Sequence, residues 1–182
     1  MYIVFANNTF RCIKSQRIIT HDAMQGLAPR VTIEIMSKDI LDGIERFSAY
    51  ASRSREAMGA PPPLSDTMQA TGDDSRILTT IIDSCADEAF LIIARYLPAS
   101  SKSSSNGTHC YSIALPANYP TGRIEAITQA LSGYIRERAL QLWYTTVKPD
   151  ESGIAGTRAE LQTANLRQLL TQREKPTKGP DQ

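Results

Sequence analysis

The alternation of apolar and polar residues favours strands in residues 1–36. Val31, Ile33 and Ile35 alternate with polar neighbours, and residues 2–5 form an apolar run before a turn-forming pair of asparagines. The period changes at Ser37, which can cap a helix with Asp39 in its first turn. The apolar positions that follow at helical spacing are Ile40, Leu41, Ile44, Phe47 and Ala51. The pattern predicts a small β region and a helix over residues 37–58, followed by a proline-rich linker to residue 72.

The strongest apolar stripe predicts a core helix over residues 73–96. Its members are Ile77, Leu78, Ile81, Ile82, Cys85, Ala89, Ile92, Ile93 and Tyr96. A second long helix is predicted over residues 122–147, from the stripe Ile124, Ile127, Leu131, Ile135 and Leu142. We expect Ile81, Ile82, Leu131 and Ile135 to share one core that joins these two helices. Gly153 and Gly156 indicate a loop, and leucines at helical spacing predict a last helix over residues 157–173.

The connections complete the expected fold. Residues 100–108 are serine-rich and carry Asn106 and Gly107, so we expect a mobile connection there. Tyr111, Ile113 and Leu115 alternate with small or polar residues and predict one short strand. The fold class is mainly α, a helical bundle of about four helices with a small N-terminal β region and one short strand. We expect an N-terminal region and linker at residues 1–72, a helical core at 73–173 and a flexible C-terminal tail at 174–182.

Composition and charge narrow the class of protein. The 182 residues are 41% hydrophobic and 21% charged, as expected of one folded domain, and the formal charge of +1 argues against a dedicated nucleic-acid or membrane-surface binder. The longest apolar run, residues 89–94, is too short to span a bilayer, and no secretion signal is recognised at the start, so we expect an unexported protein without a membrane partner. Cys12, Cys85 and Cys110 are too few and scattered for a disulfide framework, which favours a reducing compartment.

The residues that most often carry chemistry are sparse. His21 and His109 lie in no ligand-spaced motif, and although His109 and Cys110 could give two ligands to a metal, structural roles are favoured. Cys85 lies on an apolar stripe, where a buried, inert thiol is expected. Asp83 could pair with Asp87, four residues later, in acid–base work or ion binding, but a solvated charged edge is the favoured interpretation.

Aromatic and basic residues are interleaved in the second long helix. Tyr134 and Trp143 occur beside Arg136 and Arg138, as in a platform for nucleic-acid bases, but helical spacing favours core packing for Tyr134. We therefore predict an interaction protein that is not an enzyme and has no catalytic residues, cofactor or metal site.

The order of helices and apolar positions across residues 73–173 resembles one known family. The residues that carry the pattern are Asp74, Ile77, Leu78, Ile81, Ile82, Cys85, Ala86, Ala89, Tyr96, Leu97, Leu115, Pro116, Tyr134, Ile135, Arg138, Trp143, Leu166, Arg167, Leu169 and Leu170. This pattern resembles the head-to-tail connector proteins of tailed bacteriophages, the adaptor or head-completion subunits of the Mu-like prophage type. Residues 1–72 have no obvious counterpart in the compact core of that family.

The resemblance implies a function and a set of partners. It implies a helical subunit that forms a ring, commonly a dodecamer, between portal and tail around the DNA channel. Its partners would be its own copies, the portal protein, a tail or stopper protein, and DNA bound without sequence specificity. The implied location is the virion neck, and the host cytoplasm during assembly.

The C-terminal tail is the candidate portal interface. After Leu170 the only apolar residues are two prolines, so the tail cannot offset its ordering entropy by burial within its own subunit. The resemblance implies that the tail grips the portal, through Arg173, Lys175 and Lys178. Three alternatives remain: a small non-catalytic bacterial or prophage interaction or regulatory protein whose β region binds a partner, a monomeric helical domain with another binding role, and a hydrolase or transferase.

Overall fold

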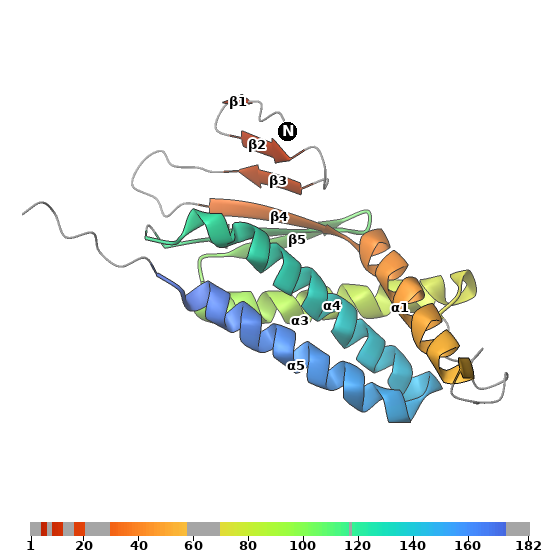
Figure 1. The fold of residues 1–182 in the computed structure, drawn as a ribbon. Helices are drawn as coiled ribbons and strands as arrows, with labels where there is room; N and C mark the ends of the chain where they lie inside the picture. The colour runs from red at the N-terminus through yellow and green to blue at the C-terminus, as the bar shows by residue number, and fades with distance from the viewer. Residues whose placement is uncertain are drawn as a thin grey trace, which may run out of the picture.

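The structure is a computed structural model that describes residues 5–6, 9–12, 17–20, 30–57, 70–116 and 118–173, with side chains from residue 30 onward except those of residues 52–57 and 121. The helices of this part are α1 (Ser37–Ala57), α3 (Ser75–Tyr96), α4 (Ile124–Val147) and α5 (Pro149–Thr171). Short 3-10 turns, η1 (Gly72–Asp74) and η2 (Thr121–Arg123), precede α3 and α4. Figure 1 shows α4 and α5 running side by side as an antiparallel pair. The predicted fold class, a mainly α bundle with a small β region, is confirmed.

A three-stranded antiparallel sheet lies along one side of the helices (Figure 1). Its order is β4 (Arg30–Met36), β6 (Thr108–Ala114) and β5 (Ser101–Ser105), and β4 pairs with β6 along its full length. A second antiparallel sheet consists of β1 (Phe5–Ala6), β2 (Thr9–Cys12) and β3 (Arg17–Thr20), with β3 beside β4. The strands predicted around Val31–Ile35 and Tyr111–Leu115 are confirmed as β4 and β6. Of the predicted strand at residues 2–5, only residue 5 lies within the described part.

The prediction of a mobile connection at residues 100–108 is wrong. Residues 101–108 form β5, a two-residue turn and the first residue of β6. Asn106 and Gly107 have positive φ angles of 49° and 70°, the backbone that a tight hairpin turn requires and that Asn–Gly pairs adopt readily. Because β5 is an edge strand with mostly exposed residues, it carries no apolar alternation, and its serine-rich composition therefore suggested a loop.

One hydrophobic core joins the sheet to the helices. The largest fully buried side chains are Tyr111, Ile33, Ile44, Leu78, Ile82, Ile93, Ile113, Leu115, Ile127, Leu131 and Ile135. Placement in one core is confirmed for Ile82, Leu131 and Ile135, whereas Ile81 is only partly buried and packs at the edge. Ile77 is 62% exposed, so the buried stripe of α3 is narrower than predicted.

The loop predicted around Gly153 and Gly156 is also wrong, because α5 begins at Pro149 and contains both glycines. Pro149 suits the first turn of a helix, where its missing N–H has no intrahelical acceptor, and acidic residues follow it in that turn. Gly156 is buried against α4, where an added Cβ would lie 2.7 Å from Nε2 of Gln141. Gly156 therefore permits a close approach of α4 and α5 rather than ending a helix.

Strand β4 and the first half of α1 share this core with the elements that follow residue 70. The buried backbone N–H of Ala70 donates to Oγ of Ser48, which ties the chain after the linker to α1. Most of the predicted linker and the whole of residues 174–182 lie outside the described residues, and the division at residue 72 stays a prediction. None of the described helices is long and apolar enough to cross a lipid bilayer.

Candidate functional site

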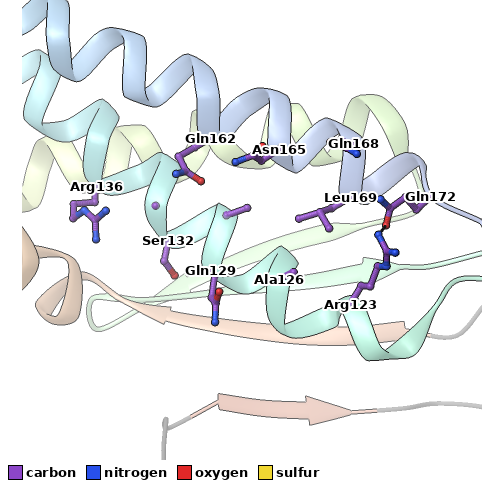
Figure 2. Close-up of a pocket in the computed structure, with 12 residues that line it drawn as sticks. Arg123, Ala126, Gln129, Ser132, Arg136, Gln162, Asn165, Gln168, Leu169 and Gln172 are labelled. Carbon is purple, nitrogen blue, oxygen red and sulfur yellow. Dashed lines mark hydrogen bonds between the residues drawn. The ribbon is translucent and has the colours of Figure 1, made fainter.

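A groove of about 620 Å³ lies between the first half of α4 and the second half of α5. Its lining residues are Arg123, Ala126, Gln129, Ala130, Ser132, Gly133, Arg136, Gln162, Asn165, Gln168, Leu169 and Gln172. Figure 2 shows the amide-bearing residues of α5 along the groove, with Arg136 and Arg123 at its two ends, and Gln129 on α4 also contributes to the lining. The close approach of the two helices is again set by a glycine, because a Cβ on Gly133 would lie 3.1 Å from Cδ of Gln162.

The amides of α5 follow the turns of the helix. Gln162, Asn165, Gln168 and Gln172 are three or four residues apart, which places them on one face. Those of Gln162, Asn165 and Gln168, and that of Gln129 across the groove, have no hydrogen-bond partner within the described chain. Each amide offers both donors and an acceptor. The groove can therefore form hydrogen bonds with a polar ligand along its length.

The two arginines are each engaged by one neighbour. Nη1 of Arg123 donates to Oε1 of Gln172. Nη2 and Nε of Arg136 donate to Oε1 of Glu137, at 2.9 and 3.3 Å. Glu137 is buried, and its Oε2 has no hydrogen-bond partner in the described part of the chain. The lining itself contains no carboxylate, so the groove favours neutral or acidic ligands.

The groove continues into a second hollow of about 210 Å³, since Ser132 and Arg136 line both. The hollow lies where β4 meets α1, and Glu34, Asp39 and Arg46 give it mixed charge. The combined surface is long, open and polar. Such a shape suits an extended segment of another chain better than an enclosed small molecule.

A separate polar cluster surrounds His109, which is 2% exposed on β6. Its Nε2 lies 3.0 Å from Oγ of Ser37 and 3.1 Å from Oδ1 of Asp83, and its Nδ1 lies 2.6 Å from Oγ of Ser104. Burial lowers the pKa of His109, the Lys102 ammonium acts in the same direction, and the Asp83 carboxylate opposes both. We assign the neutral ring's proton to Nε2, facing Asp83, so that Nδ1 accepts from Ser104. The hydroxyl of Ser37, predicted as a helix cap, instead contacts this cluster.

The cluster joins residues of α1, α3, β5 and β6. Cys110, the residue after His109 on β6, is not part of it. Neighbouring residues of a strand face opposite ways, and Cys110 is influenced by Glu34 and Ser103 on the other face of the sheet. These two residues therefore cannot bind one metal together. Among the described residues, no three His, Cys, Asp or Glu side chains are grouped as metal ligands.

Cys85, Cys12 and His21 are the other candidate residues singled out in the sequence. Cys85 is fully buried, which confirms the prediction of a buried thiol. This burial raises the pKa of the thiol to about 12. Only the backbone of Cys12 is described, in β2. His21 lies outside the described residues.

The carboxylates of α3 are less isolated than predicted. Both Asp83 and Asp87 are exposed, but Asp83 contacts the His109 cluster and Oδ1 of Asp87 lies 2.5 Å from Nζ of Lys102. The two residues thus bind the helix to the hairpin rather than forming a purely solvated edge. Core packing of Tyr134 is confirmed, because its ring is buried and its hydroxyl donates to Oε2 of Glu88 on α3, at 3.2 Å.

Of the candidate portal-binding residues, only Arg173 is described. It is exposed, and its Nη1 donates to the backbone oxygens of Leu170 and Gln172 at 3.1 and 2.6 Å. Lys175 and Lys178 lie outside the described residues. Sequence reasoning missed the amide groove, although the repeat of amides at turn spacing from Gln162 onward was available as a signal.

No protein-family model, curated protein or solved structure matches the chain. The functional proposal therefore rests on the residues and surfaces of this chain.

Proposed function

We propose that the chain is a structural subunit of a head-to-tail connector, an adaptor that assembles with its own copies into a ring between portal and tail. The observation that carries the proposal is the α4–α5 groove, an open polar surface on which the amides of Gln129, Gln162, Asn165 and Gln168 have no partners within the described chain. A partner chain would satisfy these amides, because its backbone offers the complementary donors and acceptors. The helix pattern described above supplies the phage family.

Apolar residues beside the groove support a protein partner. Leu161 is 60% exposed and lies four residues before Asn165, on the same face of α5. Ile154 is 50% exposed, two turns earlier on that face. An interface that combines exposed apolar side chains with unpaired polar groups is typical of association between proteins.

The proposed partners are copies of the chain, the portal protein, a tail or stopper protein, and the DNA that passes through the ring. The formal charge of +1 is compatible with a channel that DNA traverses, since a strongly basic lining would hold the phosphates. The proposed location is the virion neck, with assembly in the host cytoplasm.

The test uses the full chain and the portal protein from the same genome. Light scattering should give a mass many times that of one chain, negative-stain microscopy should show closed rings, and the rings should co-sediment with portal particles. A chain that stays monomeric at all concentrations and does not bind the portal would contradict the proposal. Binding of a different protein through the groove, without rings, would favour a small interaction or regulatory protein instead.

The His109 cluster favours a second candidate function, hydrolysis of an activated ester. Ser104, His109 and Asp83 form a hydroxyl–imidazole–carboxylate series, the order that activates a serine nucleophile. Oγ of Ser104 would attack the carbonyl carbon while its proton moves to Nδ1 of His109, and the leaving alcohol would then take that proton before water hydrolyses the acyl-serine. A fluorophosphonate probe should label Ser104 if this function exists. Ser103→Ala is the matched control, and an unlabelled wild-type chain would eliminate the candidate.

A further inference from the structure

The amides of the groove match the needs of an extended peptide. A segment in the polyproline conformation leaves its backbone N–H and C=O groups without internal partners, and each three-residue turn spans about 9.3 Å. Gln162, Asn165 and Gln168 follow each other at three-residue intervals, so their Cα atoms rise by about 4.5 Å per step. Two such steps span about 9 Å, close to one turn of a polyproline segment, so the amide side chains can contact successive turns of a peptide laid along α5.

The polar composition of residues 174–182 suits this groove. These residues include no apolar side chain except Pro176 and Pro180. Such a segment cannot be held by burial in an apolar pocket, so its binding must come from hydrogen bonds and charge. The two prolines favour the polyproline conformation, which lowers the entropy lost when the segment is held extended.

The charges of the groove and of this segment have matching separations. Arg123 is the last residue of η2, and Arg136 lies thirteen residues later in α4. At 1.5 Å per residue this spacing corresponds to about 20 Å along the helix. Glu174 and Asp181 are seven residues apart, which corresponds to about 22 Å at 3.1 Å per residue in a polyproline helix. One acidic residue can therefore lie near each arginine.

Both guanidinium groups keep donors for such a partner. Arg123 uses only Nη1, for Gln172, and Arg136 uses Nε and Nη2, for Glu137. The remaining nitrogens have no hydrogen-bond partner in the part of the chain that the structure describes. Among the described residues no carboxylate accepts a hydrogen bond from Arg123, so its remaining donors can take an incoming acidic side chain.

The end of α5 favours a neighbouring copy as the source of the segment. Gln172 lies at the end of the groove with extended backbone angles, φ −67° and ψ 145°. To enter its own groove, the chain would have to reverse direction immediately after Gln172. Lys175 precedes Pro176, which restricts Lys175 to extended conformations and disfavours such a reversal. A neighbouring groove can be reached without one.

We infer that residues 174–182 of one copy bind in extended form in the α4–α5 groove of the next copy. This inference rests on the proposed function and identifies the occupant of the groove as a second copy of this chain. Each copy gives its tail to one neighbour and receives a tail from the other, a head-to-tail contact that produces a ring when the rotation closes. The tail thereby joins subunits to each other, in place of the portal contact that the family resemblance implies.

Cross-linking in the full chain tests the contact directly. A photoreactive phenylalanine analogue replaces Thr177, and the protein is mixed from normal and ¹⁵N-labelled copies before illumination. Cross-linked peptides should join a tail of one isotope to a groove segment of the other, within residues 123–136 or 162–172. Cross-links confined to single copies, or directed to other surfaces, would overturn the inference.

A blocked groove gives a second test. Ala126→Trp places a large ring in the groove, whereas Ala164→Trp makes the same change at an exposed position of α5 outside it. Ala126→Trp, like deletion of residues 174–182, should reduce the mass in solution to that of a single chain and decrease intermolecular cross-links at least tenfold. Ala164→Trp should retain both properties, and an assembled Ala126→Trp variant with normal cross-links would refute the inference.

Charge reversal keeps the inference testable if Ala126→Trp does not fold. Arg123→Glu, at an exposed position, should weaken assembly, and Glu174→Arg or Asp181→Arg should restore it in the doubly changed chain. Failure of both reversals to restore assembly would count against the contact. Rings that bind portal but lack tail–groove cross-links would overturn this inference and leave the connector proposal intact. Oligomers that show those cross-links but do not bind the portal would support this inference and contradict the connector proposal. Cross-links from the tail to the portal would instead show that the tail binds the portal.

Discussion

Arg138 of α4 donates a 2.9 Å hydrogen bond from Nε to Oε2 of Glu88 on α3. The same oxygen accepts the hydroxyl of Tyr134, and Nη1 of Arg138 donates to Oε1 of Gln141 at 2.8 Å. The hydrogen bond to Glu88 is the main reason that the pKa of Arg138 is raised. This half-buried network fixes how α3 and α4 lie against each other beside an otherwise apolar contact.

Loss of the Glu88 carboxylate should destabilise the fold. Glu88→Ala leaves the Tyr134 hydroxyl and two nitrogens of Arg138 without their acceptor at a half-buried site, and we expect a loss of about 1–2 kcal/mol in the free energy of unfolding. Urea unfolding followed by circular dichroism measures this loss. Glu160→Ala, at an exposed position of α5, is the matched control and should change stability little. Equal stability of the two variants would show that the network contributes nothing measurable.

Aspartate should destabilise the protein on the buried face of α3 but not on its exposed face. Ile82 is fully buried, so Ile82→Asp would bury an unpaired charge at a cost of several kcal/mol, comparable to the stability of a whole domain. Ile77→Asp, on the same helix at 62% exposure, should leave the melting temperature nearly unchanged. Soluble yield and thermal melts compare the variants. Normal melting of Ile82→Asp would contradict the core described for α3.

The two glycines of α5 should also differ. Gly153 has no atom within 4 Å of an added Cβ, so Gly153→Ala should stabilise the protein by about 0.5–1 kcal/mol through helix propensity. Gly156→Ala should gain less or lose stability, because the new Cβ displaces Gln141 from its hydrogen bond with Arg138. Urea unfolding of the two single variants measures the difference. An equal gain at both positions would mean that Gln141 moves at no cost.

Sequence periodicity predicts those elements that bury one face. The stripes of α3 and α4 and the alternation of β4 and β6 follow from burial against a single core, so their existence could be predicted. The start of α5 was missed because Gly156 was interpreted as a helix breaker, whereas its small size serves contact with α4. The hairpin was missed because β5, at the edge of the sheet, has no buried face to impose alternation.

The candidate site was less predictable than the fold. Amide spacing identifies one face of α5, but nothing in the spacing says that α4 lies opposite or that Gln129 faces the same groove. The His109 cluster brings together residues from four elements, with Ser37 seventy-two positions away in sequence. Contacts of this kind arise from tertiary packing, and a search for ligand-spaced motifs could not find them.

The His109 cluster should make stability depend on pH. The groups that face or influence the ring are Ser37 from α1, Asp83 and Asp87 from α3, and Lys102 and Ser104 from β5. The pKa of His109 is lowered in the folded protein from its ordinary value of 6.5, so the unfolded chain binds the proton more readily. The stability conferred by the neutral ring is complete above about pH 6.5 and is lost as the pH falls from there toward the folded pKa.

Two variants separate the contribution of His109 from those of other titrating groups. His109→Gln cannot titrate, so its free energy of unfolding should fall less than that of the wild type between about pH 7.5 and pH 5.5. Asp83→Asn removes a carboxylate that raises the pKa of His109, so the folded pKa moves lower and the loss over the same interval becomes larger. Urea unfolding at several pH values gives the three slopes. The expected order, from steepest to shallowest, is Asp83→Asn, wild type and His109→Gln, and parallel curves would show that the ring does not titrate with folding.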